Sequence, residues 1–344
     1  MRLAFVLLFF AFCPCIAAAD ETAPDLFASD EELELVLETS LHTLIRNRRD
    51  RPRMEGTLTY RRPDGTEQTV PVTVRPRGKS RLEQCSFPPL RLDFKRKQVE
   101  STLFHGQKRL KLVTHCKNSP SHRNYVRQEY AIYRAYSLVS DASFRVKFAS
   151  IEYRDSEGKR RTQTEPAFFI EHTKSVAKRL DMKELSVPKV ETKQLDPEHA
   201  STYMLFQYMI GNTDFSAKLG PKGDDCCHNS KVFGPAGQTK GVIVIPYDFD
   251  QAGLINKSDA APSPALPIRS VRQRLYRGFC THNGELERTI ADFKNERTAI
   301  ETLFASEEFS DSSRKSMQRY LDEFYDIVND PDAMQKNIAG KCRG

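Results

Sequence analysis

The chain has 344 residues and carries 53 Lys and Arg against 46 Asp and Glu, a formal net charge of +7. Because this excess is mild and both signs are interspersed along the chain, we predict no nucleic-acid partner. The length exceeds that of an ordinary domain of ~100 to 150 residues, so we expect one large two-lobed unit or two domains.

The first nineteen residues have the order of a cleaved secretory signal peptide. A basic start, Met1-Arg2, precedes an apolar stretch from Leu3 to Ile16 and the small residues Ala17-Ala18-Ala19. An uncleaved anchor is the alternative, because the apolar stretch is only slightly shorter than the ~20 residues that span a bilayer. We predict an exported chain, periplasmic or secreted, or in the secretory lumen of a eukaryote, with no stable membrane insertion after cleavage.

Cysteines support export, because removing residues 1–19 leaves an even number of them. The six are Cys85, Cys116, Cys226, Cys227, Cys280 and Cys342. Cys85 and Cys116 flank neighbouring predicted strands, so we expect them to pair. We expect the adjacent Cys226 and Cys227 to bond outward, to the two remaining cysteines in either order, rather than to each other.

Hydrophobic periodicity and turn residues predict the elements. In chain order we expect an amphipathic helix after Ser29-Asp30 that carries Leu33, Val36, Leu37, Leu41, Leu44 and Ile45; a hairpin of strands 56–60 and 69–74 around a turn at 63–65; strands 90–94 and 110–114; a helix over 123–139; strands 144–153 and 167–170; a helix over 197–210; a strand over 242–245; a Pro-rich loop over 262–267; and a mostly helical tail over 285–334.

Polar residues gather at the ends of two apolar elements. Gly211-Asn212-Thr213-Asp214 follows the predicted helix, His228-Asn229 comes next, and Pro246-Tyr247-Asp248-Phe249-Asp250 follows the apolar strand. Phosphoryl transfer uses such a set: one carboxylate orients the attacking hydroxyl, while an amide and a carboxylate hold magnesium on the phosphates. Each motif also has a structural explanation, because Asn and Asp commonly cap turns.

In this order the motifs resemble the spore-coat CotH kinase family, and more weakly the HipA kinases. The family's R-x-R-G-x-S loop is matched by Arg75-Pro76-Arg77-Gly78-Lys79-Ser80, and its later elements by Asn212-Thr213-Asp214, Asn229 and Tyr247-Asp248-Phe249-Asp250. The resemblance implies an α+β, bilobal, protein-kinase-like fold. Its parts would be a signal peptide (1–19), a helical N-terminal extension (20–53), a small sheet-plus-helix N-lobe (54–171) and a mainly helical C-lobe with a helical tail (172–344).

The resemblance also implies roles for individual residues. Asp214 would be the catalytic acid or base. Asn229 and Asp248, with Asp250 as a further ligand, would bind magnesium or manganese. The groups near ATP would be Arg77, Gly78, Ser80, Lys111, Glu129 and Glu171. Within the ATP site, residues 170–172 would form the adenine hinge and Glu129 would face a strand lysine. For the phosphate-binding lysine we favour Lys111, with Lys95 and Arg91 as rivals.

The function implied is a kinase that transfers a phosphoryl group from ATP to a hydroxyl of a protein or glycan. A catalytically silent pseudokinase, acting as a secreted or envelope binding protein, is the alternative. A hydrolase with Asp248 and Asp250 as a metal pair is a third possibility, but the sequence offers it no further histidine or acid ligands. His228 could serve as a base or ligand, although a histidine beside a disulfide is more often structural. An arginine cluster, Arg272, Arg274 and Arg277, is either an acidic-substrate patch or an exposed helix face.

Overall fold

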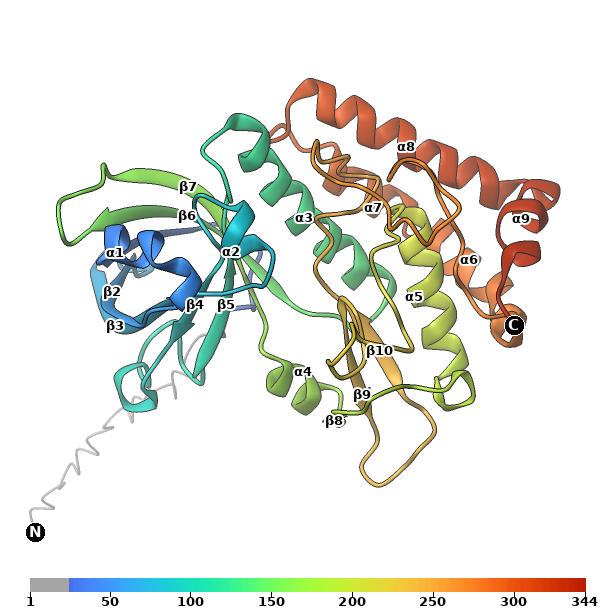
Figure 1. The fold of residues 1–344 in the computed structure, drawn as a ribbon, viewed down its shortest axis with the longest axis horizontal. Coiled ribbons are helices and arrows are strands. Elements are labelled where there is room, and N and C mark those ends of the chain that lie inside the picture. The colour runs from blue at the N-terminus through green and yellow to red at the C-terminus, as the bar shows by residue number, and fades with distance from the viewer. Residues whose placement is uncertain (1–24) are drawn as a thin grey trace, which may run out of the picture.

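A computed structural model describes residues 25–344. The predicted signal peptide lies outside these residues. Within the described part, no helix is long and apolar enough to cross a membrane. Figure 1 shows a β-barrel at one end of the molecule and a group of helices at the other, with α3 (Pro120–Val139) between them.

Within residues 25–344, the largest sheet is a closed barrel of seven strands in the order β1-β2-β3-β4-β5-β7-β6. Neighbouring strands are antiparallel except where β6 and β1 close the barrel in parallel, with Leu33 opposite Ala149. The strands are β1 (Leu33–Thr39), β2 (Met54–Arg61), β3 (Glu67–Pro76), β4 (Leu90–Asp93), β5 (Arg109–Val113), β6 (Val146–Asp155) and β7 (Gln163–Ile170).

The closed barrel overturns the predicted fold class. The fold is mixed α+β, but it is not the bilobal kinase-like fold with a small sheet N-lobe, because β1 pairs with both β2 and β6 and so closes the N-terminal sheet into a barrel. The predicted helix after Ser29-Asp30 is also wrong over its first half. Leu33, Leu35 and Leu37 alternate with polar or smaller residues, which suits a strand, and only α1 (Leu41–Arg46) is helical.

The barrel encloses its own hydrophobic core. Alternate residues of the strands point inward, and Leu37, Leu58, Val74, Leu90 and Leu112 are all fully buried. Alternation of side chains along each strand explains why one face of every strand reaches this core. The short helix α1 also contributes to it.

A second, larger core lies between α3, the outer side of β6 and β7, and the rest of the chain. Its central element is α5 (Pro197–Met209), which starts at an Asp196 cap with proline in its first turn. The remaining elements are α2 (Arg81–Gln84), α4 (Thr173–Arg179), β8 (Lys183–Glu184), β9 (Ser230–Gly234), β10 (Ile243–Pro246), α6 (Leu286–Asn295), α7 (Arg297–Phe304), α8 (Asp311–Asn329) and α9 (Pro331–Asn337). Strands β10, β9 and β8 form a small sheet of their own.

Most of the other predicted elements are confirmed. The hairpin around residues 63–65 is β2 and β3, the helix over 123–139 is α3 with three further residues at its start, and the tail is helical. These segments have one clear periodicity each, so local pattern and tertiary structure agree on them.

Three disulfides are present in the described chain. The predicted pair, Cys85 and Cys116, is confirmed, with its Cα atoms 4.6 Å apart. The outward bonding of Cys226 and Cys227 is wrong: these neighbours pair with each other, and Cys280 pairs with Cys342. Residues 278–280 and 343 hydrogen-bond to one another, which brings that last pair together from distant segments. Disulfides of this kind fit a protein of an oxidising, extracytoplasmic compartment.

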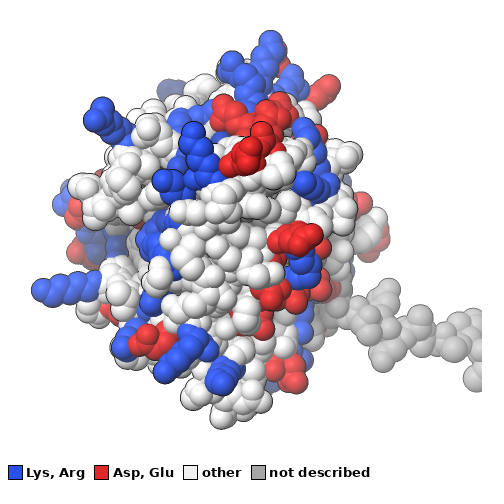
Figure 2. Space-filling view, turned by 90° about the vertical axis from the view of Figure 1, so that its right-hand side faces the viewer, with Lys and Arg blue, Asp and Glu red and all other residues white. Residues whose placement is uncertain are grey.

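Figure 2 shows the face formed by the helical end of the molecule. Basic and acidic side chains both occur on it, and neither sign covers it alone. This mixed surface agrees with the mild net charge.

Candidate functional site

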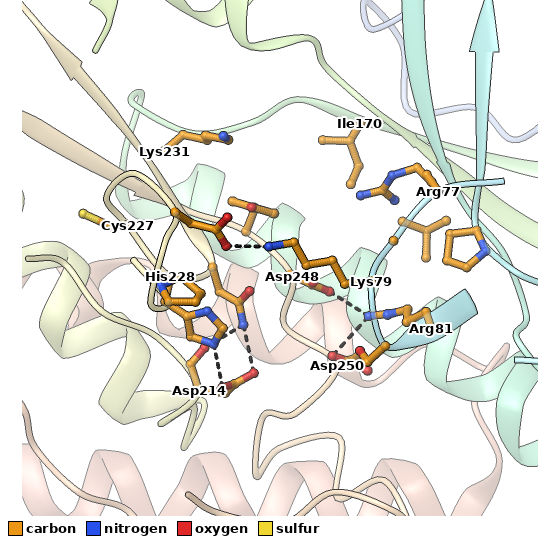
Figure 3. A pocket seen from close by; sticks show the side chains of 18 of the residues that line it. Arg77, Lys79, Arg81, Ile170, Asp214, Cys227, His228, Lys231, Asp248 and Asp250 are labelled. Carbon is orange, nitrogen blue, oxygen red and sulfur yellow. Dashed lines mark hydrogen bonds and ion pairs between the residues drawn. The ribbon is translucent and has the colours of Figure 1, made fainter. Parts of the chain in front are cut away.

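A cavity of about 1760 Å³ lies between the barrel and the small β8–β10 sheet. Its walls come from segments far apart in the chain: the 77–84 segment after β3, the middle of α3, α4 and β8, the loop after α5, and the β9–β10 hairpin. Figure 3 shows how the charged side chains of these walls face one another. The cavity exceeds the ~300 to 1,000 Å³ of an ordinary small-molecule pocket.

The barrel side presents two half-buried cations, Arg77 and Lys111. Within the described residues neither forms an ion pair. Lys111 lies on β5 with its Nζ 4.8 Å from the centre of the Tyr247 ring. Burial, reinforced by the nearby Arg77, lowers the pKa of Lys111 to about 7. Burial likewise lowers the pKa of Arg77. Cations that have lost water without gaining a carboxylate favour binding of an anion.

A second basic group reaches across the cavity from the 77–84 segment. Arg81, at the start of α2, places Nη2 2.7 Å from Asp248 Oδ1 and 3.1 Å from Asp250 Oδ1. Burial alone would lower the pKa of Arg81, but the two carboxylates raise it overall. Lys79 pairs with Asp224 on the opposite rim. The segment therefore bridges the barrel and the acidic side of the cavity.

The β9–β10 hairpin positions two of the predicted metal ligands. Ser230 and Pro246 are opposite each other in the ladder, so Asn229 and Asp248 lie at the same end of the hairpin. The Tyr247 N–H donates to the Asn229 carbonyl at 3.1 Å. Asn229 and Asp248 both have positive φ, 48° and 63°. Asn and Asp tolerate this left-handed region better than most residues, and such conformations cluster at functional sites.

The loop after α5 holds Asp214 in a network of hydrogen bonds. Its carboxylate accepts from His228 Nε2 at 2.8 Å and from Asn229 Nδ2 at 2.9 Å. This bond to Asp214 is the main reason that the pKa of His228 is raised. Arg277 Nη1 donates to the carbonyls of Thr213 and Phe215, both at 2.7 Å, and so fixes the backbone on either side of Asp214. The Asp214 side chain remains 44% exposed, open to a ligand.

Helix α3 closes the back of the cavity with Glu129 and Tyr133. Burial raises the pKa of Glu129 to about 8, although Arg81 opposes the shift. The Tyr133 hydroxyl accepts from the Asp248 N–H at 2.8 Å. That Glu129 faces a strand lysine stays a prediction; Arg81 is the cation that most opposes the rise in the pKa of Glu129.

The acidic residues offer a partial fit to a magnesium or manganese ion. In residues 25–344 no group of three or more His, Cys, Asp or Glu side chains is arranged to hold a metal. Asp248 and Asp250 do converge on one point, because both reach the same nitrogen of Arg81. Magnesium is usually bound by one or two carboxylates together with substrate phosphates. The two converging carboxylates suit that mode of binding, and Asn229 lies at the same end of the β9–β10 hairpin as Asp248.

The structure places most of the predicted site residues around one cavity. Lining it are Arg77, Gly78, Ser80, Glu129, Asp214, Asn229, Asp248 and Asp250. Lys111 does not line the cavity itself, but its Nζ lies over the ring of Tyr247, which does. Its rival Arg91 bonds to Asp93, and neither Arg91 nor Lys95 lines the cavity.

Two predicted groups lie elsewhere. Glu171 is buried and pairs with Arg179 at 2.9 Å, so of the proposed hinge only Ile170 lines the cavity. The arginine cluster is not an open patch either. Arg272 and Arg274 stack on the Tyr320 ring, and Arg277 supports the Asp214 loop.

Sequence reasoning missed Arg81, Lys257 and the supporting role of Arg277. Lys257 pairs with Asp250 at 2.9 Å and raises the number of cations on that carboxylate to two. The only signal for Arg81 was its place directly after the R-x-R-G-K-S motif. Its partners are 167 and 169 positions away, a pairing that no local pattern reveals.

No family model and no curated protein matches this chain. The function is therefore inferred from the chemistry of the cavity.

Proposed function

We propose that this chain is an exported phosphotransferase, periplasmic or secreted, that moves a phosphoryl group from ATP to a hydroxyl of a protein or glycan with magnesium or manganese. One observation carries the proposal: two half-buried cations that form no ion pair within residues 25–344, Arg77 in the cavity wall and Lys111 over the cavity-lining Tyr247, lie opposite Asp214 and the converging pair Asp248 and Asp250. Cations suit the phosphates of a donor, and carboxylates suit a divalent metal and an acceptor hydroxyl.

Each residue has a distinct part in this reaction. Arg77 and Lys111 bind the phosphates of the donor. Asp214 accepts a hydrogen bond from the acceptor hydroxyl, orients its oxygen and receives its proton as the new bond to phosphorus forms and the bond from that phosphorus to the bridging oxygen breaks, which releases ADP. Asn229 and His228 hold the Asp214 carboxylate in one orientation through their hydrogen bonds. A divalent metal, when bound by Asp248 and Asp250, supplies neutralisation of the phosphate charge.

A silent binding protein is the second candidate. It is favoured by Arg81, whose guanidinium already neutralises Asp248 and Asp250 at the point where a metal would bind. In that case the cavity binds an anion without transferring it, and the carboxylates serve only to anchor the 77–84 segment.

A titration of the oxidised, signal-free protein with magnesium and ATP separates the two. A ligand that binds only the folded state stabilises it by about 2.7 kcal/mol at a hundred times its Kd. The phosphotransferase predicts a melting temperature that rises with ATP only when magnesium is present, and slow formation of ADP. Stabilisation by ATP that is equal with and without magnesium, and no ADP, would identify a binding protein. No effect of ATP at all would refute both.

A further inference from the structure

Arginine side chains gather on the outer face of the barrel, beside the large cavity. We call them the barrel arginine patch, whose members are Arg51, Arg53, Arg75, Arg91 and Arg109. Each member is half-buried or exposed. Of these arginines only Arg51 also lines the large cavity. The patch is therefore a separate surface that meets the cavity at one edge.

The register of the sheet places like charges side by side in this patch. Arg75 on β3 is directly opposite Arg91 on β4, and Arg91 is directly opposite Lys111 on β5. Because neighbouring strands are only ~4.8 Å apart and paired residues point to the same face, these cations form one row across three strands. Like charges in directly opposite positions destabilise a sheet. A bound anion would remove that destabilisation.

Acidic side chains of the barrel neutralise only part of the patch. Asp93, on β4, pairs with three of the arginines, at 2.6 Å (Arg91), 3.2 Å (Arg109) and 3.8 Å (Arg53). Glu55, on β2, accepts a hydrogen bond from the Thr73 hydroxyl at 3.0 Å and pairs with no arginine of residues 25–344. One carboxylate is thus shared among three guanidinium groups.

The other two arginines, Arg75 and Arg51, pair with no carboxylate of the described chain. Burial, reinforced by the three neighbouring arginines, lowers the pKa of Arg75, although Asp93 opposes the shift. Arg51 has a positive φ of 52°, an uncommon conformation for a bulky side chain. Its Nη2 donates to the Gly78 carbonyl at 2.8 Å, which joins the patch to the 77–84 segment. These two guanidinium groups are the ones free to bind an external anion.

We propose that the barrel arginine patch docks an acidic segment of a partner polypeptide. Charge complementarity requires a polyanion, and the patch already binds a carboxylate: Arg91 donates to Asp93 through Nε at 3.1 Å and Nη2 at 2.6 Å. An Asp or Glu of the partner can repeat this charge-assisted contact on Arg75. The proposal does not rest on phosphoryl transfer, because it concerns a surface outside the cavity.

Two other polyanions fit the patch less well. A membrane surface is disfavoured because stable anchoring needs an apolar group beside the basic one, and Leu219 is the only exposed large hydrophobic residue in residues 25–344. An acidic polysaccharide is disfavoured because the outward-facing residues 73, 75, 91, 93, 109 and 111 include no aromatic ring for the C–H face of a sugar. Both remain outcomes of the test.

The test measures binding of a fluorescein-labelled peptide to the oxidised, signal-free chain by fluorescence anisotropy. The peptide has about ten alternating Glu and Ser residues, enough to cross the patch when extended, and a peptide with Lys in place of Glu is the probe control. We expect saturable binding of the acidic peptide alone, with a Kd of about 0.1 mM or tighter. Raising the ionic strength from about 0.02 M to about 0.2 M should weaken it at least ~tenfold.

The double variant Arg53→Gln/Arg75→Gln removes two charges of the patch that lie outside the cavity. It should weaken peptide binding at least ~tenfold and leave the melting temperature equal or higher, since fewer like charges then oppose one another. Lys315→Gln/Arg319→Gln is the matched control, because it removes two exposed charges from α8, at the helical end of the molecule. Its peptide affinity should equal that of wild type.

The proposal is overturned if the acidic peptide does not bind saturably, or if the two double variants weaken its binding equally. Tighter binding of heparin, or of vesicles of phosphatidylserine and phosphatidylcholine, would also overturn it by changing the class of partner. Loss of peptide binding in Arg53→Gln/Arg75→Gln with unchanged affinity for ATP would support a docking surface separate from the cavity. None of these outcomes depends on whether the chain transfers phosphate.

Discussion

Charged side chains on the two sides of the large cavity differ in whether they have a partner. On the barrel side, Arg77 and Lys111 are half buried and, among the described residues, take part in no ion pair. On the opposite side every carboxylate of the cluster is already engaged: Asp214 with His228 and Asn229, and Asp250 with both Arg81 and Lys257.

This difference indicates on which side of the cavity a ligand would gain more binding energy. A buried charge without a partner has lost solvation that a ligand of opposite sign can restore, so binding energy is available on the barrel side. A paired carboxylate can bind a metal only by giving up its present cation. We therefore expect anion binding to depend on the barrel side and metal dependence to require movement of Arg81.

The largest expected effect comes from Asp214→Asn. If Asp214 receives the acceptor proton, this nearly isosteric change should lower turnover by about 10²- to 10⁴-fold while the affinity for magnesium-ATP stays within a few fold. Rates of ADP formation and a binding titration measure the two effects. Asp225→Asn, which neutralises another carboxylate of the cavity, is the control. Equal losses in both variants would indicate a general charge effect.

The next largest effect is expected on the unfolding free energy, from removal of the Cys85–Cys116 disulfide that anchors the 77–84 segment. This bond closes a separation of 31 residues, so its removal by double serine substitution should cost about 3 to 4 kcal/mol of unfolding free energy. The Cys226–Cys227 bond has a separation of one residue and constrains the unfolded chain very little. Denaturant unfolding of the two double-serine variants compares them. A larger loss from the adjacent pair would contradict the chain-entropy explanation.

Asp248→Asn tests the acidic side directly. We expect the metal-dependent part of ATP binding to fall at least ~tenfold, because a charged oxygen ligand is replaced by a neutral one. Apo stability should fall slightly, by about 1 kcal/mol or less, since the Asp248 side chain is 37% exposed and its pair with Arg81 is partly screened. Asp259→Asn, on the same cavity wall but outside this pair, is the control. Full metal dependence in Asp248→Asn would remove this residue from the metal site.

The barrel side is tested by Lys111→Met, for which we expect about tenfold weaker binding of ADP or ATP and a folded state at least as stable as wild type. The reason is that a half-buried cation, which pairs with no carboxylate of residues 25–344, is replaced by an apolar chain of similar length. Lys108→Met, at an exposed position just before β5, is the matched control and should leave affinity unchanged. Unchanged affinity in Lys111→Met would place the anion elsewhere.

The smallest expected effect is a pH dependence with opposite signs for binding and stability. The pKa of Lys111 is about 7 in the folded chain against 10.5 for an ordinary lysine, so its charge is lost as pH rises through about 7. Affinity for ADP should therefore weaken between pH 6 and 9. Over about pH 7 to 10.5 the unfolded chain binds the extra proton, so this residue's contribution to stability rises with pH.

Lys111→Arg, which stays charged throughout this range, is the control for the pH dependence. Its ADP affinity should be nearly independent of pH. A wild-type profile that rises with pH would contradict the assignment of Lys111 as the anion-binding group.

Local sequence pattern determined much of the secondary structure and the choice of site residues. The hairpin at 54–76, helix α3 and the helical tail each have one dominant periodicity, and they form as predicted. The polar groups at Asp214, Asn229 and Asp248 were recognisable because each directly follows or precedes an apolar element, and all three line one cavity.

Only the tertiary structure decided the rest. Residues 33–39 fit a helical stripe as well as a strand, and the free edges of β2 and β6 selected the strand and closed the barrel. Local geometry decided that Cys226 pairs with its neighbour Cys227. Contacts between distant segments decided that Arg81 lies between Asp248 and Asp250. Periodicity shows which face of an element is apolar; it does not show which distant charge or strand edge will meet it, because that depends on packing of the whole chain.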